Sequence, residues 1–133
     1  MTIALIRAAL ETRLLALSPA LPTALENALI DPAGAAHQRA YLLPNTTKTP
    51  GFDLITKHEK GIFQVSVCYP LHQGSGACAA RAELIRAQFN AGLRLTQGGI
   101  TVLIYEWPSI GRAMPEDAYF VIPVSISYRS FTS

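Results

Sequence analysis

The residues of this sequence that could do chemistry gather in one short stretch, where two cysteines flank a histidine. Cys68, His72 and Cys78 fall within eleven residues of one another, and His58 would complete a set of four zinc-type ligands. Zinc sites are usually built on tight pairs such as Cys-x2-Cys, which place two ligands on one turn. Here Cys68 lies in an alternating apolar segment, His72 in a turn and Cys78 on the apolar side of a helical segment. We therefore predict packed or surface thiols beside a solvated histidine, with no metal site and no thiol nucleophile.

A glycine-rich turn, Gly74-Ser75-Gly76, stands directly before a helical segment, and such turns can bind phosphate through free amides. A P-loop requires a lysine and then Ser or Thr after its second glycine, but Ala77 and Cys78 follow here. The dinucleotide-binding glycine pattern is absent too. The stretch is typical of a strand-to-helix turn that uses the backbone freedom of glycine.

Acid–base chemistry has equally little support. Glu116 and Asp117 are sequence neighbours, and neighbouring side chains point apart in most backbone conformations. His37 adjoins a turn and has no partner that the sequence identifies. We predict no catalytic residues, no cofactor and no metal, so the chain is not expected to be an enzyme.

Length and composition indicate a single domain, residues 1–133, with one core. Half of the residues are apolar and 15% are charged, which excludes a solvated, disordered chain. The net charge of +2 and the scattered basic residues give no reason to expect specific nucleic-acid binding or a membrane surface. No stretch is long and apolar enough to span a bilayer. Two free thiols suit a cytoplasmic product.

Apolar periodicity predicts two helices and four strands. Residues 2–17 and 77–90 repeat apolar positions every three or four residues, as an amphipathic helix does. In the second helix Cys78, Ala82, Ile85 and Phe89 should face inward, with Arg81 and Arg86 outward. Gly92 is placed as a helix C-cap glycine would be. The predicted strands are residues 38–43, 61–69, 100–105 and 119–129.

The two longer strand segments alternate most clearly, and Pro123 in the last of them suggests an edge strand or a bulge. The order of elements predicts an α+β fold, with a mainly antiparallel twisted sheet and two helices packed on one face. The segments 108–111 and 112–115 are expected to form a turn and a loop. The side chains predicted to be buried are Phe63, Val65, Val67, Ile85, Phe89, Val102, Val124 and Ile126.

A polar stretch at residues 44–51 is the most loop-like part of the chain, and three apolar residues, Phe52, Leu54 and Ile55, follow it. We predict that residues 45–60 form an arm that is mobile in the free subunit and buries these side chains on a partner. The alternative is that the arm folds back on the domain's own sheet. Trp107, the only tryptophan, lies at a strand end and could anchor either the core or an interface.

The order of the segments also resembles a known family. A first helix containing IRAALETRL is followed by LPTALEN, a DPAG turn, QRAYLLP, GIFQVSVCYP and the turn HQGSG. The helix ARAELIRAQFNAGLRL, GGITVLI, PSIGR and DAYFVIPVSISYR complete the series. From about Ile3 to Tyr128 this order is similar to the bacteriophage tail-terminator-like family, which includes the lambda-type terminator. HQGSG is one residue longer than the corresponding turn of the family.

The resemblance implies a structural protein with no enzyme activity or cofactor. Such proteins form a ring, a homo-hexamer, on the finished tail tube, stop its polymerisation and offer a docking surface to head-completion proteins. DNA passes through the ring without specific binding, and no membrane is involved. The implied location is the host cytoplasm during assembly and then the head-proximal end of the virion tail.

Two other functions stay open: a neck or baseplate adaptor of a phage or phage-like particle, and a small-ligand binding module. For the terminator reading, the candidate residues for contacts with the tube or with neighbouring subunits are Lys48, Phe52, Leu54, Ile55, Lys57, Trp107 and Arg112.

Overall fold

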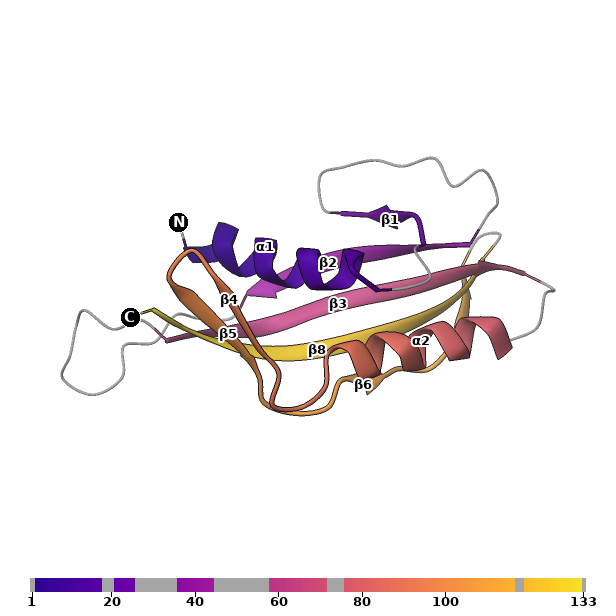
Figure 1. Cartoon of the computed structure of the whole chain (residues 1–133). Helices are drawn as coiled ribbons and strands as arrows, with labels where there is room; N and C mark the ends of the chain where they lie inside the picture. The colour runs from indigo at the N-terminus through magenta and orange to yellow at the C-terminus, as the bar shows by residue number, and fades with distance from the viewer. Residues whose placement is uncertain are drawn as a thin grey trace.

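One curled sheet forms the body of the protein, and both helices cover the same face of it (Figure 1). The structure is a computed structural model, and it describes residues 2–17, 21–25, 36–44, 58–71, 76–116 and 119–132. The helices are α1 (Thr2–Leu15) and α2 (Gly76–Gln88). The strands are β1 (Thr23–Ala24), β2 (His37–Pro44), β3 (His58–Pro70), β4 (Arg94–Gln97), β5 (Ile100–Ile104), β6 (Ser109–Ile110), β7 (Met114–Glu116) and β8 (Tyr119–Thr132).

The sheet runs β1-β2-β3-β8-β5-β4, and β6 and β7 also pair with β8. The β1–β2 pair is parallel and the other pairs are antiparallel, so the sheet is mixed but mainly antiparallel. The prediction of an α+β fold with both helices on one face is confirmed. No helix among the described residues is long and apolar enough to cross a membrane.

Two long antiparallel strands, β3 and β8, form the centre of the sheet and stay in register from His58–Phe131 to Pro70–Tyr119. The prediction offered an edge or a bulge at Pro123, and the edge is wrong, because β3 covers one side of β8 and β5, β6 and β7 cover the other. The pairing is irregular at Pro123, however, since residues 111–113 oppose only residues 122 and 123 between the pairs Ile110–Val124 and Met114–Val121. The Gly111 amide donates to the Pro123 carbonyl at 2.8 Å. The nitrogen of Pro123 therefore faces the irregular chain between β6 and β7, where a missing N–H costs little.

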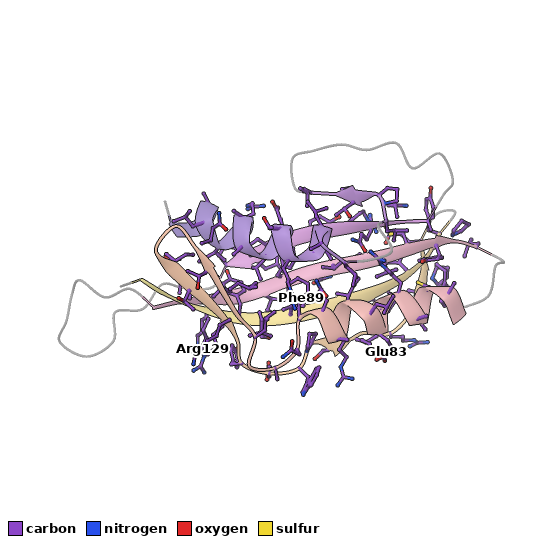
Figure 2. The ribbon with its side chains drawn as sticks, in the orientation of Figure 1. Glu83, Phe89 and Arg129 are labelled. Carbon is purple, nitrogen blue, oxygen red and sulfur yellow. The ribbon has the colours of Figure 1, made fainter. Side chains whose placement is uncertain are left out.

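The core lies between the helices and the sheet. Ile6, Leu10 and Leu14 of α1 pack in the same cluster as the inner side chains of α2 and the strands. All eight side chains predicted to be buried are at most 1% exposed. Phe63 and Phe89 meet with ring centroids 6.1 Å apart, which ties β3 to the end of α2. Figure 2 shows Phe89 between the helix layer and the sheet.

The prediction that Arg81 points outward is wrong, since only 3% of it is exposed. Its Nε donates to the Oε1 atom of the buried Gln38 at 3.3 Å, and the Nε2 of Gln38 donates to the Oγ1 of Thr23 at 2.9 Å. Burial lowers the pKa of Arg81, and the nearby Tyr69 opposes that shift. The buried polar chain connects α2, β2 and β1, and a buried charge is tolerated only when it is hydrogen-bonded in this way. Arg86 does lie partly in solvent, as predicted.

The C-terminal ends of the two helices bind each other. Arg13 Nε donates to the Gln88 carbonyl at 3.0 Å, and Gln88 Nε2 donates to the Arg13 carbonyl at 3.1 Å. Carbonyls in the last turn of a helix have no partner within the helix, so a cation there is favourable. The pair fixes the position of α2 against α1.

Several short strands lie where the sequence indicated turns. The β4–β5 hairpin turns at Gly98 and Gly99, which have φ of 54° and 86°, values that suit a two-residue turn with two positive φ angles. Gly92 has φ of 90°, but it lies beyond the helix end and its amide donates to the Ile104 carbonyl at 2.6 Å. It therefore belongs to the connection with β5 rather than to a cap of α2. The predicted turn and loop before β8 contain β6 and β7.

Candidate functional site

The face of the sheet opposite the helices carries an apolar group on β2 and β3. Tyr41, Leu43 and Ile62 are 38%, 49% and 37% exposed, and Leu43 lies directly opposite Ile62. We call these three residues the sheet patch. Strand β1 pairs with β2 only at Gln38 and Arg39. Among the described residues, no strand pairs with the outer edge of β2 beside this patch. Large side chains half in water at an open sheet edge are typical of a surface that binds another protein.

A basic row crosses the same face next to the sheet patch. Lys60 lies opposite Arg129, Arg129 opposite Leu103, and Leu103 opposite Arg94, across β3, β8, β5 and β4. Like charges placed directly opposite one another are unfavourable unless another group compensates them. The Arg129 guanidinium lies 4.4 Å from the ring centroid of Tyr105, so its charge rests on an aromatic face. Arg129 is half-buried at this position of β8 (Figure 2).

A second apolar group lies along the other side of the molecule, on β6 and the segment leading into it, beside α2. Trp107 and Ile110 are 52% and 36% exposed, and we call them the Trp107 patch. Leu84 is 41% exposed, but it lies on the flank of α2 that it shares with Arg81 and Gln88, away from Trp107. The Arg86 guanidinium is 5.4 Å from the Trp107 ring centroid, and its Nε donates to the Pro108 carbonyl at 3.1 Å. Trp107 is thus held against α2 with half of its surface in water. The interpretation of Trp107 as a core anchor is wrong, and its interpretation as an interface anchor stays a prediction.

A small concavity lies where β7 curls toward β2. Arg39 Nη2 donates to both carboxylate oxygens of Glu116 at 3.3 and 3.2 Å. His37 meets the Tyr119 ring edge-on with centroids 4.8 Å apart, and Cys68 lines the floor. Burial is the largest single influence on the pKa of Arg39 and lowers it, but the hydrogen bond to Glu116 and the charge interactions with Cys68, Tyr41 and Glu116 together outweigh burial, so the pKa of Arg39 is raised. Glu116 lies in β7, and its side chain is 54% exposed although it pairs with Arg39.

Neither thiol is activated. Burial raises the pKa of the Cys68 thiol, and burial with the nearby Cys68 raises the pKa of Cys78 to about 11. A thiol with a raised pKa stays protonated near neutral pH and is a poor nucleophile and metal ligand. Cys78 packs in the core, with Sγ 3.6 Å from the Val67 carbonyl, whereas Cys68 lies on the opposite face of the sheet.

The described ranges contain no group of three His, Cys, Asp or Glu residues that could hold a metal ion. His72 lies outside the described residues, and nothing is described of the His58 side chain. The concavity lined by His37, Arg39, Cys68 and Glu116 has a volume of about 110 Å³. A groove between α1 and β4, lined by Arg13 and Gln97 among others, has about 250 Å³. Both are below the roughly 300–1,000 Å³ of typical small-molecule sites.

The structure tests only part of the predicted interface. Trp107 and Arg112 are exposed, on either side of β6. The rest of the set, Lys48, Phe52, Leu54, Ile55 and Lys57, lies outside the described residues. The predicted arm also extends too far, because residues 58–60 belong to β3. Sequence reasoning missed the sheet patch and both Leu84 and Ile110, although adjacent apolar residues in a strand, such as Ile62-Phe63, do indicate that both faces carry apolar side chains.

Among the described residues, the exposed apolar and basic groups are more prominent than the two small concavities. The chain belongs to the family of phage tail terminator proteins, whose sequence model matches residues 5–128. Its place is therefore in a phage tail, among other tail and head proteins.

The fold is also found among solved structures, eight of whose chains match. One of them has a TM-score of 0.80 and 34% sequence identity, and the match covers 98% of this chain and 96% of that one. None of the curated proteins matches the sequence.

Proposed function

We propose that this protein caps the end of the tail tube, stops its polymerisation and provides the surface on which head-completion proteins dock. The family match over residues 5–128 is the observation that carries the proposal. In this proposal the chain acts as a homo-hexameric ring, assembles in the host cytoplasm and stays at the head-proximal end of the tail. It has no catalytic role and needs no cofactor.

The physical requirements of a cap support this role. A tube grows because each added ring offers the surface that the next ring binds. A terminator must therefore bind the tube end with one surface and present a different surface outward. Ring closure requires two further, mutually complementary patches on each subunit. The exposed apolar and basic groups described above are candidates for these contacts. Arg112 is another candidate, and so is the rest of the predicted arm, residues 45–57, on the basis of its composition.

A length assay tests the proposal. The major tail tube protein encoded in the same phage genome is polymerised with increasing amounts of the chain, and tube lengths are measured by negative-stain electron microscopy. We expect shorter or length-limited tubes at substoichiometric amounts, with a gold-labelled chain at one end of each tube. Unchanged lengths and unlabelled ends would refute the proposal. Labelled ends with unchanged lengths would favour the neck or baseplate adaptor.

A further inference from the structure

We propose that the outer edge of β4 binds an extended, acidic segment of another protein, which adds to the sheet as one more strand. The site consists of the backbone edge of β4 (Arg94–Gln97) and the groove between β4 and α1. The proposal goes beyond the capping role and does not depend on it, because strand addition can be measured without a tail tube.

β4 is the last strand at one end of the sheet, so among the described residues one of its two edges has no neighbouring strand. The Ile104 amide donates to the Leu93 carbonyl at 2.9 Å, so the backbone of Leu93 faces β5. Along a strand, the backbone groups of successive residues point alternately to the two sides. Leu95 therefore faces β5 as well, whereas the amides and carbonyls of Arg94 and Thr96 point away from the sheet. These are the groups with which a further strand forms its hydrogen bonds.

The edge of β4 is regular and held in place. The strand contains no proline, and its pairing with β5 continues over Arg94–Gln97 without a bulge. The turn of the hairpin packs against α1, because a Cβ atom at Gly98 would lie 2.7 Å from Leu5 Cδ2. An edge that is ordered before a partner arrives loses little conformational freedom on binding.

The groove beside this edge offers room for the side chains of an added strand. It lies between α1 and the β4–β5 hairpin (Figure 1) and has a volume of about 250 Å³, which suits side chains better than a small ligand. Ala9 and Ala16 line it on the helix side, and Leu95, which packs against the core, lines it on the strand side. Alternate side chains of an added strand would point to the face that carries the helices. Small apolar side chains at those positions would therefore enter the groove.

Charge determines the chemistry of the segment. Arg13 lines the groove, where its Nε donates to the Gln88 carbonyl at 3.0 Å, and Arg94 is exposed on β4. The one acidic residue of α1, Glu11, stands two positions from both Ala9 and Arg13, so it points to another side of the helix. β4 itself has no acidic residue. A segment that carries Asp or Glu beside its apolar residues therefore complements the site.

Binding of a synthetic peptide to the full chain tests the proposal. The probe is a peptide of about eight residues, capped at both ends, that alternates valine with aspartate, and the matched control peptide has lysine in place of aspartate. The ¹⁵N-labelled chain is titrated with each peptide by NMR, and amide hydrogen exchange is measured with and without the probe. We expect at least tenfold tighter binding of the aspartate peptide, and at least tenfold slower exchange of the Arg94 and Thr96 amides in its presence. Protection of other amides instead, or no binding at about 1 mM peptide, would overturn the proposal.

A proline variant tests the backbone edge. Thr96→Pro removes an amide that points away from the sheet and keeps those that pair with β5, so β4 should still form. The affinity for the aspartate peptide should fall at least tenfold. Thr96→Val is the matched control, because it keeps the amide, and its affinity should change less than twofold. Unchanged affinity of Thr96→Pro would contradict strand addition.

A charge variant tests the acidic character of the segment. Ala16→Glu places a negative charge on an exposed residue that lines the groove, so the chain should stay folded and should bind the lysine peptide more tightly than the aspartate peptide. Leu15→Glu is the matched control, because Leu15 is 54% exposed outside the groove, and it should keep the preference of the wild type. A preference for aspartate that persists in Ala16→Glu would overturn the assignment. Far-UV circular dichroism checks the folding of each variant, and Ala16→Glu decides the question even if Thr96→Pro does not fold.

A second copy of the chain is the competing occupant of the edge. Sedimentation velocity of the free chain distinguishes it, and we expect Thr96→Pro to leave self-association unchanged. Self-association that is lost in Thr96→Pro and kept in Thr96→Val would assign the edge to another copy and overturn the proposal.

Discussion

Gly61 lies where the sheet leaves no room for a side chain, so Gly61→Ala should destabilise the fold. A Cβ atom at this position would lie 2.5 Å from the Leu43 carbonyl oxygen and 2.7 Å from the Tyr128 hydroxyl. Tyr128 is fully buried directly opposite Gly61, and Leu43 belongs to the neighbouring strand β2. Both contacts are below the 3.0 Å that real Cβ atoms tolerate, and the closer one is with backbone. The strand pairing between β2 and β3 would have to shift.

The expected cost follows from these contacts. Overpacking a well-filled site costs about 1–3 kcal/mol, and the loss of glycine's freedom in the unfolded chain returns about 0.4–1 kcal/mol. We expect Gly61→Ala to lower the free energy of unfolding by about 1–2 kcal/mol. Tyr128→Phe removes one of the two clashes, so the double variant should lose less than Gly61→Ala does.

Urea unfolding followed by far-UV circular dichroism is the appropriate assay, since the exposed Trp107 is a weak fluorescence reporter of folding. Gly76→Ala is the matched control. A Cβ at Gly76, the first residue of α2, meets nothing within 4 Å, so that variant should be as stable as the wild type or slightly more stable. A Gly61→Ala chain within about 0.5 kcal/mol of the wild type would refute the packing argument, because that is the spread of neutral surface changes.

Three further predictions concern two buried groups, the thiols and one ion pair. Burial, with Glu59 nearby, raises the pKa of Tyr128 to about 12 from its ordinary 10.0, and that of Cys78 rises to about 11 from 9.0, chiefly through burial. The folded state therefore favours the protonated forms of both groups. Their contribution to the free energy of unfolding is fully present below pH about 9 and is lost as pH rises toward 12, by about 1.4 kcal/mol per pH unit for each group. Urea midpoints from pH 8 to 12 should show this fall, and Tyr128→Phe should flatten its upper part; an unchanged slope contradicts the assignment. Replacing both Cys68 and Cys78 by Ala should cost at most a few kcal/mol and leave assembly intact in the tube-length assay, whereas one zinc per wild-type chain by elemental analysis would contradict a structural role. Glu116→Gln removes an ion pair whose side chains are 30% and 54% exposed, so the loss should stay below about 1 kcal/mol, and a loss of several kcal/mol would mean that the pair holds β7 in place.

The main layers of the fold could be predicted from the sequence because their signals are local. In β3 and β8, apolar side chains alternate over a long stretch, and only one register buries Phe63, Val65 and Val124 together. The inner face of α2 follows from the spacing of Ala82 and Ile85 in the same way. In both cases the period alone identifies the buried side, whichever element packs against it.

Features that depend on distant partners could not be predicted. Arg81 is buried because the Oε1 of Gln38, on a strand far away in sequence, accepts its hydrogen bond, and no local pattern reveals such a partner. β6 and β7 are two and three residues long, too short for any periodicity, and they exist because the long strand β8 offers free backbone groups beside them. The sequence left the place of Trp107 open for the same reason, because its exposure depends on contacts with Arg86 of α2, a residue distant in sequence.

The sheet patch, in contrast, has a local signal in the sequence, namely adjacent apolar residues within one strand. Leu42 and Leu43 are adjacent in β2, as are Ile62 and Phe63 in β3, and adjacent residues of a strand point to opposite faces. Leu42 and Phe63 are buried under the helices, so Leu43 and Ile62 necessarily lie on the other face, where they are 49% and 37% exposed. A sheet that needed to be soluble on that face would alternate apolar with polar residues at these positions. Among the described residues no strand pairs with β2 beside these apolar pairs, so they mark the part of the sheet where a protein partner would bury most apolar surface.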